Sequence, residues 1–519
     1  MCGIIAKPAV CDKEDSLISY RGPDSTHKTL VNDYAFTFHR LAIMDTTHSG
    51  DQPFENNNWV LMCNGEIYNY KKLRTDYQYP YISHSDCEVF MPLLDKHNIH
   101  EICDILDGEF AFVAYDKKQN KVIAARDPMG IRPLFYGYTA TRQIAFASEM
   151  KALIDCCKEI NPFPPGFYFD GKDFKPYLKL YEIADSKYKN IDDVLKNIRE
   201  LLVDAVIKRL DADVPIGYLL SGGLDSSLVC SIAAKYLKKP IDTFAIGLDY
   251  NPIDLKYAKQ MADYLGTNHT EVIFTRKDIV EVLKHIVWVT ETWDVTTIRA
   301  STPMYLLCKY IRNSTNVRVV LSGEISDELF GYKYTDFAPD ATSFQTESQK
   351  RIKELYMYDV LRADRCISSN SLEARVPFSD KKFISYVMSI DPELKLNKYN
   401  MGKYLLRKAF DNQEFLPQEI LWRDKAAFSD AVGHGLVDCL IELAEEKYSD
   451  EEFKQKVKNY KHNPPLTKEG LMYRELFDEY FPNQDHVIAG YWLPNQEWPN
   501  CNLTDPSARH LPNYGASGE

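Results

Sequence analysis

Leu220-Ser221-Gly222-Gly223-Leu224-Asp225-Ser226-Ser227 is the stretch of this sequence that decides the fold. An apolar run over residues 214–220 precedes it and predicts a buried strand, and the apolar residues from Leu228 to about Leu237 predict a helix. A glycine turn between a strand and a helix suits phosphate binding, because the backbone can approach the anion closely and the helix N-terminus offers free N–H groups.

An acid stands in this turn, and the lysine of a P-loop is missing. Asp225 would lie beside the expected phosphates. A carboxylate is favourable there only if a cation such as Mg²⁺ lies between the two negative groups. The stretch therefore predicts a nucleotide site that includes a metal ion.

Strands and helices alternate in the C-terminal part of the chain, which predicts a parallel sheet. Strands are expected at residues 241–247, 271–274 and 316–321, and a helix at 255–265. The last strand again enters an acidic turn, Ser322-Gly323-Glu324-Ile325-Ser326-Asp327-Glu328. Ligands bind at the carboxyl ends of parallel strands, so Asp225 and Asp327 are expected to share a magnesium ion. Ordinary capping of a helix N-terminus explains either acid alone, but not the Ser-Gly before both turns.

The chain begins Met1-Cys2-Gly3 and runs directly into an apolar strand. Removal of Met1 would leave Cys2 at the N-terminus, and a free α-amine with a pKa of about 7.7–8 can act as the base for its own thiol. A cysteine in such a strand is more often a buried structural residue. Cys2 alone therefore does not establish a nucleophile.

Polar turns follow several strands of the first 180 residues. They are Arg21-Gly22-Pro23-Asp24, the segment 39–45, the segment 60–69, the expected helix start 84–88 and the segment 124–134. Each one by itself is explained as turn chemistry or a surface ion pair. Together and in this order they closely resemble the class II glutamine amidotransferases, which hydrolyse glutamine with an N-terminal cysteine.

That resemblance implies a four-layer α/β/β/α sandwich of the N-terminal nucleophile hydrolases. It implies that Cys2 is the nucleophile and that Asn64 and the Gly65 backbone N–H form the oxyanion hole. The glutamine-binding residues it implies are Arg40 for the α-carboxylate, Glu66 and Asp86 for the α-ammonium, and Leu41, Ile43 and Met44 for backbone contacts. A zwitterionic substrate needs both signs of charge, and the two-pronged arginine suits a carboxylate.

The glycine turn itself resembles the pyrophosphatase loop of the N-type ATP pyrophosphatases. Joined to the N-terminal domain, it resembles the glutamine-hydrolysing asparagine synthetases, with further matching stretches at 292–301, 373–378 and 423–430. The resemblance implies that ATP activates the β-carboxylate of aspartate as β-aspartyl-AMP, with release of pyrophosphate. Ammonia from glutamine would travel through an internal tunnel and attack this acyl-adenylate.

The resemblance also assigns the residues of the second site. ATP-binding residues would be Leu220, Ser221, Gly222, Gly223, Asp225, Ser226, Ile246, Ser322 and Gly323. Glu324 would support formation of the adenylate, and Lys425 would face the α-phosphate. A lysine outside such a motif is usually a solvated surface residue. Asp225 and Asp327 would be the Mg²⁺ ligands.

Three positions depart from the pattern of that family. Ile325 stands where the family usually has glycine, Tyr332 follows Gly331 in place of a second glycine, and Ala426 follows Lys425 in place of glutamate. If residue 325 needs a positive φ, isoleucine there costs about 1–3 kcal/mol. None of the three removes a residue that was given a reacting role.

The 519 residues are enough for two domains. We expect a glutaminase domain at 2–185, a Rossmann-like α/β ATP-pyrophosphatase domain at 186–505 and a flexible tail at 506–519. Prolines and glycines at 161–181 mark the boundary, and an amphipathic helix is expected at 191–210.

Composition excludes other classes of protein. The net charge of −13 argues against a general binder of nucleic acid or anionic membrane. No transmembrane run or signal peptide is evident, and 12 cysteines without a CxxC pair favour a reduced, cytoplasmic protein. The partners expected are glutamine, aspartate and ATP, and relatives suggest a homodimer.

Alternative functions are not all excluded. The β-lactam synthetases resemble this architecture but lack the nucleophilic cysteine, and amidotransferases that act on sugar phosphates or phosphoribosyl pyrophosphate lack the Ser-Gly-Gly-Leu-Asp-Ser loop. A catalytically impaired relative, kept as a binding or storage protein, is favoured only by the three departures. A different carboxylate acceptor also stays open, since aspartate rests on resemblance alone.

Overall fold

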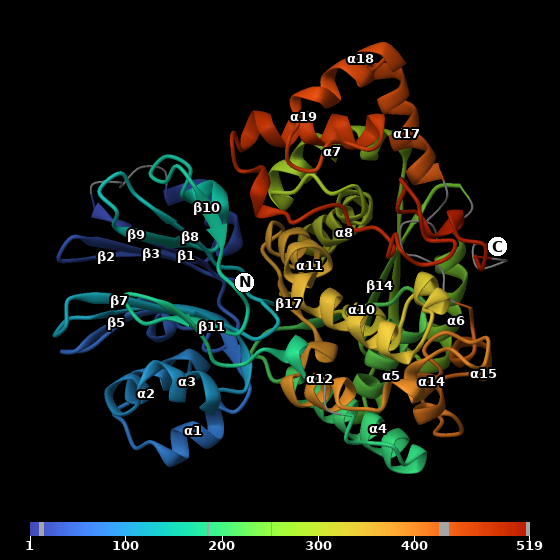
Figure 1. Ribbon diagram of the computed structural model, residues 1–519. Coiled ribbons are helices and arrows are strands. Elements are labelled where there is room, and N and C mark those ends of the chain that lie inside the picture. The colour runs from blue at the N-terminus through green and yellow to red at the C-terminus, as the bar shows by residue number, and fades with distance from the viewer. Residues whose placement is uncertain (10–14, 184–185, 251, 425–434, 515–519) are drawn as a thin grey trace.

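A five-stranded parallel sheet forms the centre of the C-terminal half of the protein (Figure 1). The computed structural model describes residues 1–9, 15–183, 186–250, 252–424 and 435–514. The order of the strands is β15 (Asn268–Phe274), β14 (Asp242–Leu248), β13 (Ile216–Leu219), β16 (Val319–Leu321) and β17 (Glu373–Arg375). Each neighbouring pair is parallel, as the alternation of strands and helices predicted.

Helices cover both faces of this sheet (Figure 1). Consecutive strand residues point to opposite faces, so Phe244 and Ile246 join one hydrophobic core and Ala245 joins the other. The helices before the acidic turn are α4 (Ile191–Ile207), α5 (Leu224–Leu237), α6 (Ile253–Leu265), α7 (Arg276–Thr290) and α8 (Val295–Ser314). The helices after it are α9 (Ser326–Phe330), α10 (Ala341–Glu354), α11 (Asp359–Ser368), α12 (Lys381–Met388), α13 (Pro392–Lys395), α14 (Tyr404–Phe410), α15 (Gln418–Leu421), α17 (Gly435–Lys447), α18 (Asp450–Lys456) and α19 (Lys468–Tyr480).

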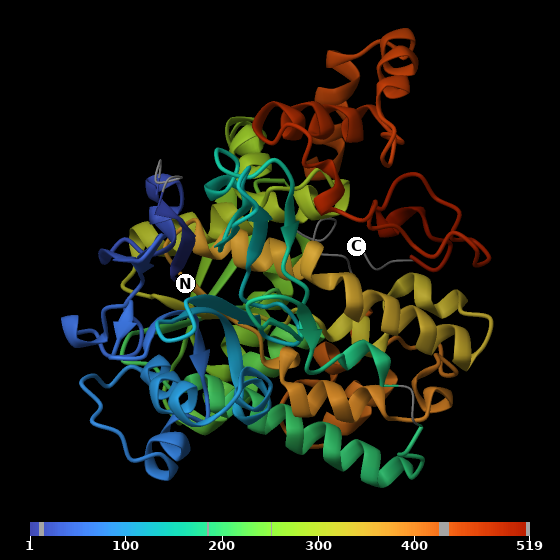
Figure 2. The ribbon, with the colours of Figure 1, turned by 60° about the vertical axis from the view of Figure 1, so that its left-hand side comes forward.

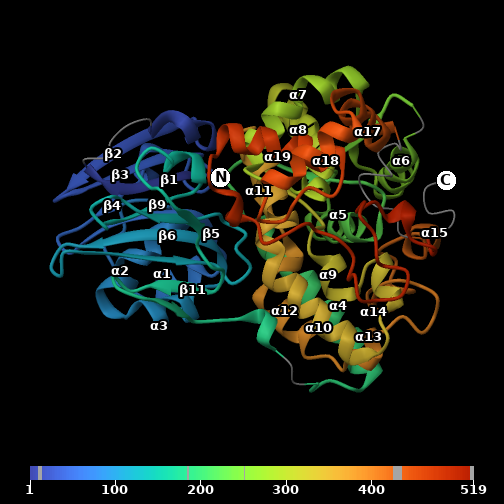
Figure 3. The same cartoon turned by 45° about the horizontal axis from the view of Figure 1, so that its top comes forward.

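Two antiparallel sheets lie face to face in the N-terminal half (Figures 1 and 3). The first contains β10 (Ile160–Pro162), β8 (Phe135–Tyr138), β9 (Ile144–Ala147), β1 (Gly3–Pro8), β3 (Tyr34–Arg40) and β2 (Ser25–Val31), in that order. The second contains β12 (Phe174–Pro176), β11 (Phe167–Phe169), β7 (Lys121–Arg126), β6 (Gly108–Asp116), β5 (Trp59–Ile67) and β4 (Phe54–Glu55). Ile4 and Phe38 of the first sheet pack against Met62 and Val113 of the second.

The outer faces of the two sheets are covered differently. Helices α1 (Tyr70–Asp76), α2 (Phe90–Lys96) and α3 (Ile99–Ile105) cover the second sheet. The outer face of the first sheet carries the short 3₁₀ turns η2 (Asp15–Arg21) and η5 (Met150–Ala152) and packs against the C-terminal half. The α/β class is therefore confirmed. In place of the outer helical layer that the four-layer sandwich predicts on this sheet, the structure has these two 3₁₀ turns.

Several element boundaries differ from the predictions. Helix α5 begins at Leu224, four residues before the predicted start, because the last residues of the glycine turn form the first turn of the helix. Strand β3 ends at Arg40, so only the first two residues of the segment 39–45 belong to a strand. The predicted helix 191–210 is α4 followed by a 3₁₀ turn, Lys208–Leu210. The predicted domain boundary at residue 185 lies outside the described residues.

The two halves share their hydrophobic cores. Leu41 and Ile43 of the N-terminal half belong to the same buried cluster as Leu202 of α4 and Leu228 of α5. Met1 and Ile5 belong to the cluster that contains Trp293. The N-terminus consequently lies between the two halves (Figure 1). No helix in the described part of the chain is both long and apolar enough to cross a membrane.

Candidate active sites

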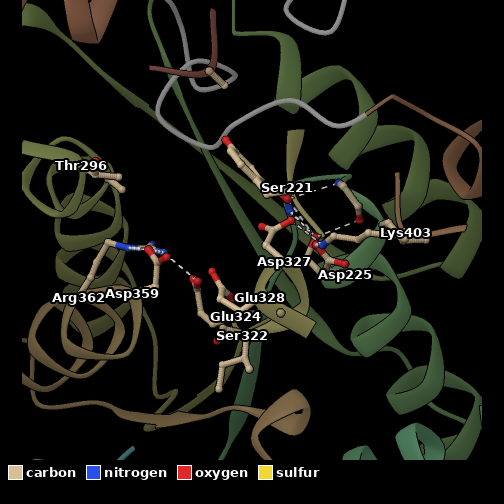
Figure 4. A pocket seen from close by; sticks show the side chains of 18 of the residues that line it. Ser221, Asp225, Thr296, Ser322, Glu324, Asp327, Glu328, Asp359, Arg362 and Lys403 are labelled. Atoms are coloured by element: carbon tan, nitrogen blue, oxygen red, sulfur yellow. Dashed lines mark hydrogen bonds and ion pairs between the residues drawn. The ribbon is translucent and has the colours of Figure 1, made fainter. Parts of the chain in front are cut away.

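A cavity of about 260 Å³ opens at the carboxyl ends of β13 and β16, where the two acidic turns were predicted to meet. The predicted ATP-binding and reacting residues that line it are Leu220, Ser221, Gly223, Asp225, Ser226, Ile246, Ser322, Gly323, Glu324 and Asp327. Figure 4 shows several of these side chains converging from the two turns. The structure therefore brings these predicted residues together around one cavity.

Close contact between the two turns explains their glycines. A Cβ atom on Gly323 would lie 2.8 Å from the backbone N of Ser226, so no side chain fits there. Gly222 has φ of +71°, and its Cβ would lie 2.4 Å from the backbone N of Ala258 in α6. Gly222 does not line the cavity, so its contribution is to pack the turn against α6. The free N–H groups of α5 begin at Leu224, after an N-cap without a side-chain cap.

Asp225 and Asp327 face each other across a lysine ammonium group (Figure 4). Lys403 Nζ lies 2.7 Å from Asp225 Oδ2 and 2.7 Å from Asp327 Oδ1. Ser326 Oγ donates a hydrogen bond to Asp225 Oδ1 at 2.7 Å. The two carboxylates therefore come together as predicted. Lys403, just before α14, was missed because nothing in its local sequence distinguishes it from a surface lysine.

Glu324 lies on the opposite side of the cavity, paired with an arginine. Its Oε2 accepts a hydrogen bond from Arg362 Nη2 at 2.8 Å, and the same nitrogen lies 2.7 Å from Asp359 Oδ1. Burial raises the pKa of Glu324, and the adjacent Arg362 opposes this shift. Burial likewise raises the pKa of the neighbouring Glu328. The cavity thus combines several carboxyl groups with buried cations, among them Arg362 and Lys403.

Ser322 carries an unused hydrogen-bonding group into this cavity. Its hydroxyl is buried and has no hydrogen-bond partner among the described residues, while its backbone N–H donates to the Arg375 carbonyl at 3.1 Å. A buried polar group without a partner is costly, so the hydroxyl is suited to a ligand. Lys425, the predicted partner of the α-phosphate, and Ala426 lie outside the described residues.

Ile325 has the positive φ that would make isoleucine strained at this position. Its φ is +81° and its ψ is −19°, in the left-handed region that disfavours a β-branched residue. The side chain is 2% exposed and packs in the core below the turn. Tyr332 has φ of −118°, which any residue adopts, so the second departure causes no backbone strain.

The C-terminal segment is not a free tail as far as the structure describes it. Pro506, Ala508 and Leu511 line the cavity, and Figure 2 shows this last segment, in red, beside the yellow helices. Arg299 of α8 binds Asp505 through two hydrogen bonds of 2.9 and 2.8 Å. The prediction of a flexible tail is therefore wrong for residues 506–514, because their apolar side chains are buried against the cavity wall.

A second site surrounds Cys2 at the N-terminus of β1. The backbone N of Cys2 donates to Asn64 Oδ1 at 3.0 Å, and the Leu41 backbone N lies 3.5 Å from the Cys2 sulfur. Asn64 Nδ2 is buried and has no hydrogen-bond partner among the described residues. An unpaired amide donor beside a thiol is the arrangement expected of an oxyanion hole. Burial raises the pKa of the Cys2 thiol.

Gly65 follows Asn64 on β5, and a larger residue at this position would disturb the sheet. A Cβ atom on this residue would lie 2.7 Å from the Glu109 carbonyl oxygen on β6. Met1 precedes Cys2 as a buried residue, and its α-ammonium donates to the Leu372 carbonyl at 3.2 Å. Desolvation lowers the pKa of that α-ammonium to about 5.

Arg40 lies at the end of β3, where it is held by neighbouring oxygens. Its Nη1 lies 2.7 Å from Asp51 Oδ1 and donates to the Thr47 carbonyl at 2.6 Å. A substrate carboxylate would therefore share this guanidinium with Asp51. Ile43 and Met44 are buried near Leu41, and the Ile43 carbonyl already accepts from the Asp213 N–H at 3.2 Å.

Glu66 and Asp86 are both buried, as a pair of ammonium ligands would be. Asp86 Oδ2 accepts from the Ile67 backbone N–H at 2.7 Å, and burial raises the pKa of Asp86 to about 6. Glu66 Oε2 lies 2.9 Å from Arg375 Nη2, which comes from the C-terminal half. Sequence reasoning recognised the stretch that contains Arg375 but gave this residue no role.

Two family models match this chain. The glutamine amidotransferase domain family matches residues 1–207, and the asparagine synthase family matches residues 197–342 and 335–504. The fold and sites therefore define a two-domain enzyme of the amidotransferase class, in which a glutaminase is joined to a synthetase.

Similar proteins narrow this class to one family. The chain is 41% identical to the probable glutamine-hydrolysing asparagine synthetase of Schizosaccharomyces pombe over 100% of both chains. It is 40% identical to that of Dictyostelium discoideum over 98% of both, and 39% identical to the human asparagine synthetase over 96% of this chain and 95% of the relative. The chain belongs to the glutamine-hydrolysing asparagine synthetase family.

Proposed function

We propose that this protein makes L-asparagine from L-aspartate, L-glutamine and ATP. Two sites in one chain support this function most directly: an unpaired amide donor beside the Cys2 thiol, and a polar cavity with an unpaired Ser322 hydroxyl at the ends of two parallel strands. The first site would release ammonia from glutamine. The second would activate aspartate and consume that ammonia.

Cys2 would attack the side-chain amide carbon of glutamine. Its own α-amine would take the thiol proton once Met1 is removed, so no histidine partner is needed. The developing oxyanion would receive hydrogen bonds from Asn64 Nδ2 and the Gly65 backbone N–H. Water would then hydrolyse the thioester, giving glutamate after ammonia has left.

The second site would form β-aspartyl-AMP by attack of the aspartate β-carboxylate on the α-phosphorus of ATP, with pyrophosphate as the leaving group. The glycine turn and the N-terminus of α5 would hold the phosphates, while Ser322 and Gly323 complete the nucleotide site. Ammonia would attack the acyl carbon and expel AMP. Glu324 has a raised pKa and could accept the proton that the attacking ammonia loses.

Mg²⁺ fits the carboxylate oxygens of Asp225 and Asp327, which are hard ligands. No group of three or more histidine, cysteine or acidic side chains in the described part of the chain forms a metal site. These two carboxylates would therefore hold the ion together with substrate phosphates, and the bound ion would neutralise phosphate charge. Lys403, which now bridges the two acids, would then be available to the phosphates.

Product analysis tests the proposed reaction. Incubation with aspartate, ATP, Mg²⁺ and glutamine is expected to give asparagine, AMP, pyrophosphate and glutamate. Formation of ADP would contradict the adenylate, and the absence of any product would favour the impaired relative. A different amide product with another carboxylic acid would identify a different acceptor.

Cys2→Ala separates the two sites. We expect this variant to lose glutamine-dependent synthesis by at least about 10³-fold, because no other thiol replaces the nucleophile. Synthesis from ammonium salts is expected to survive within a factor of about two. Loss of both activities in a folded variant would contradict the two-site function. Intact mass should also show Cys2 as the first residue of active protein.

Location and assembly extend the same proposal. No disulfide joins the described cysteines, which supports a reduced compartment such as the cytoplasm. A homodimer would follow the pattern that relatives suggest. Subcellular fractionation would test the cytoplasmic location, and light scattering would test the homodimer.

A further inference from the structure

Arg375 belongs to the C-terminal half but extends its side chain into the glutaminase site. It ends strand β17, and its side chain is fully buried. Nη1 donates to the carbonyls of Arg209 and Asp211 at 2.9 and 2.7 Å, and Nε donates to Glu373 Oε1 at 2.9 Å. These contacts fix the guanidinium from the synthetase side. Its Nη2 atom then lies 2.9 Å from Glu66 Oε2.

The main chain of Arg375 serves the other site. Strand β17 is parallel to β16, with Arg375 opposite Leu321. The Arg375 carbonyl consequently accepts the hydrogen bond from the backbone N–H of Ser322, at 3.1 Å. Ser322 opens the acidic turn and lines the nucleotide cavity. One residue therefore contacts a glutamine-site carboxylate with its side chain and a nucleotide-site residue with its backbone.

Glu66 lies among several other charged groups. The acids are Asp86 from η4 (Asp86–Val89), Glu109 directly opposite on β6, and Glu373 on β17; the cations are Arg375 and Arg132, and the Cys87 thiol is also close. Burial raises the pKa of Glu66, and Arg375 opposes this shift most strongly. Loss of this direct cation would raise the pKa of Glu66 further.

We propose that Arg375 is a positioning residue for glutamine, supplied by the synthetase domain to the glutaminase site. It favours the ionised form of Glu66 and orients this carboxylate toward the α-ammonium of the substrate. When both acids are ionised, Glu66, Asp86 and Arg375 together carry one net negative charge, which the substrate ammonium neutralises. This inference rests on the proposed role of Glu66 in glutamine binding.

The position of Arg375 has a functional consequence. The glutamine site is complete only when β17 is in place, and the same strand residue supports the nucleotide turn. The protein therefore cannot form a competent glutamine site without forming the sheet edge that holds Ser322. Through Arg375, ammonia production therefore depends on a folded synthetase site.

Arg375→Gln and Arg375→Lys test the role of the charge. We expect KM for glutamine in R375Q, measured as glutamate release, to rise at least about tenfold at pH 7 and to fall again toward pH 9 as Glu66 ionises. R375K keeps the cation, so between pH 7 and pH 9 its KM should stay within about threefold of that of the unaltered protein. Ammonia-dependent synthesis should stay within about threefold in both, because the backbone bond to Ser322 is unchanged.

Lys208→Met is the matched control. Lys208 also crosses the interface between the two halves, where it lies 2.9 Å from Asp107 and contacts Asp380, but it does not contact Glu66. Its loss should leave KM for glutamine unchanged. Equal losses of glutaminase and ammonia-dependent activity in both Arg375 variants, with KM unchanged, would show a structural role only and overturn the proposal.

A double variant keeps the test decisive if R375Q does not fold. In E66Q/R375Q two neutral amides can hydrogen-bond to each other, and we expect its KM for glutamine to be no higher than that of E66Q. A further rise would show that Arg375 acts independently of Glu66, which contradicts the proposal. Glutamate release by the variants tests the role of Arg375. Formation of asparagine and AMP by the unaltered protein tests the proposed function. A failure of the Arg375 proposal can therefore be told apart from a failure of the proposed function.

Discussion

Single residues carry much of the chemistry, and Ile325 shows what one departure does to a turn. This residue has φ of +81° at the start of α9, in the turn whose Gly323 packs closely against Ser226. The family position suits glycine, and isoleucine compensates for the strain by burying its side chain in the core. The departure therefore exchanges backbone strain for packing and leaves Glu324 and Asp327 in the cavity.

Ile325→Gly and Ile325→Ala separate strain from packing. Both variants lose the buried side chain, so both should have a lower free energy of unfolding than the natural protein. Only glycine relieves the positive φ, and we expect I325G to be more stable than I325A by about 1 kcal/mol. Urea unfolding measures this difference. Greater stability of I325A would show that the turn is unstrained.

Asp86 should make glutamine binding sensitive to pH. Its pKa of about 6 is raised by burial, so protonation below pH 6 would remove one of the charges proposed to bind the substrate ammonium. We expect KM for glutamine to rise as pH falls through 6, approaching about tenfold per pH unit below pH 5. Asp86→Asn should have a high KM at every pH. A step that persists in D86N would assign it to another group.

Elements set the shape of the synthetase cavity, and the final described segment is one of them. It is fixed by the Arg299–Asp505 ion pair, and by Lys333 Nζ, which donates to the carbonyls of Asn513 and Tyr514 at 3.2 Å each. The sequence alone offered no pattern here, because its apolar residues are few and do not repeat. Their burial depends on Trp498 and on Tyr334, and Tyr334 is distant in sequence.

Removal of residues 506–519 should open this cavity to water. The chain would keep Asp505 and its contact with Arg299 but lose Pro506, Ala508 and Leu511 from the wall. We expect more hydrolysis of the acyl-adenylate, seen as about two or more AMP formed per asparagine. Removal of 515–519 alone is the matched control. An unchanged ratio and unchanged KM for ATP would refute this role.

The two halves of the molecule pack into shared hydrophobic cores and are expected to unfold as one cooperative unit. Buried ion pairs such as Arg21–Asp364 join the halves, and Leu41 and Ile43 complete a core that belongs mostly to the C-terminal half. Burying such charges is favourable only when both partners are present. The two catalytic domains are therefore not independent modules.

A fragment of residues 1–183 should consequently lose function. We expect its kcat/KM for glutamine hydrolysis to fall at least about tenfold and its resistance to protease to drop, because both the shared core and Arg375 are missing. Addition of the fragment 186–519 should restore part of the activity if the halves reassemble. Full glutaminase activity of 1–183 by itself would disprove the shared-core argument.

The sequence by itself determined the fold class and the positions of the two candidate sites, because strand–turn–helix patterns and local motifs fix glycine turns, acids and Cys2 within a few residues. The tertiary structure decided what depends on contacts between distant segments: Lys403 between the two acids, Arg375 beside Glu66, and the C-terminal wall of the cavity. A side chain that acquires its role from a partner hundreds of residues away leaves no local signal, since periodicity and turn chemistry report only on neighbours in the chain.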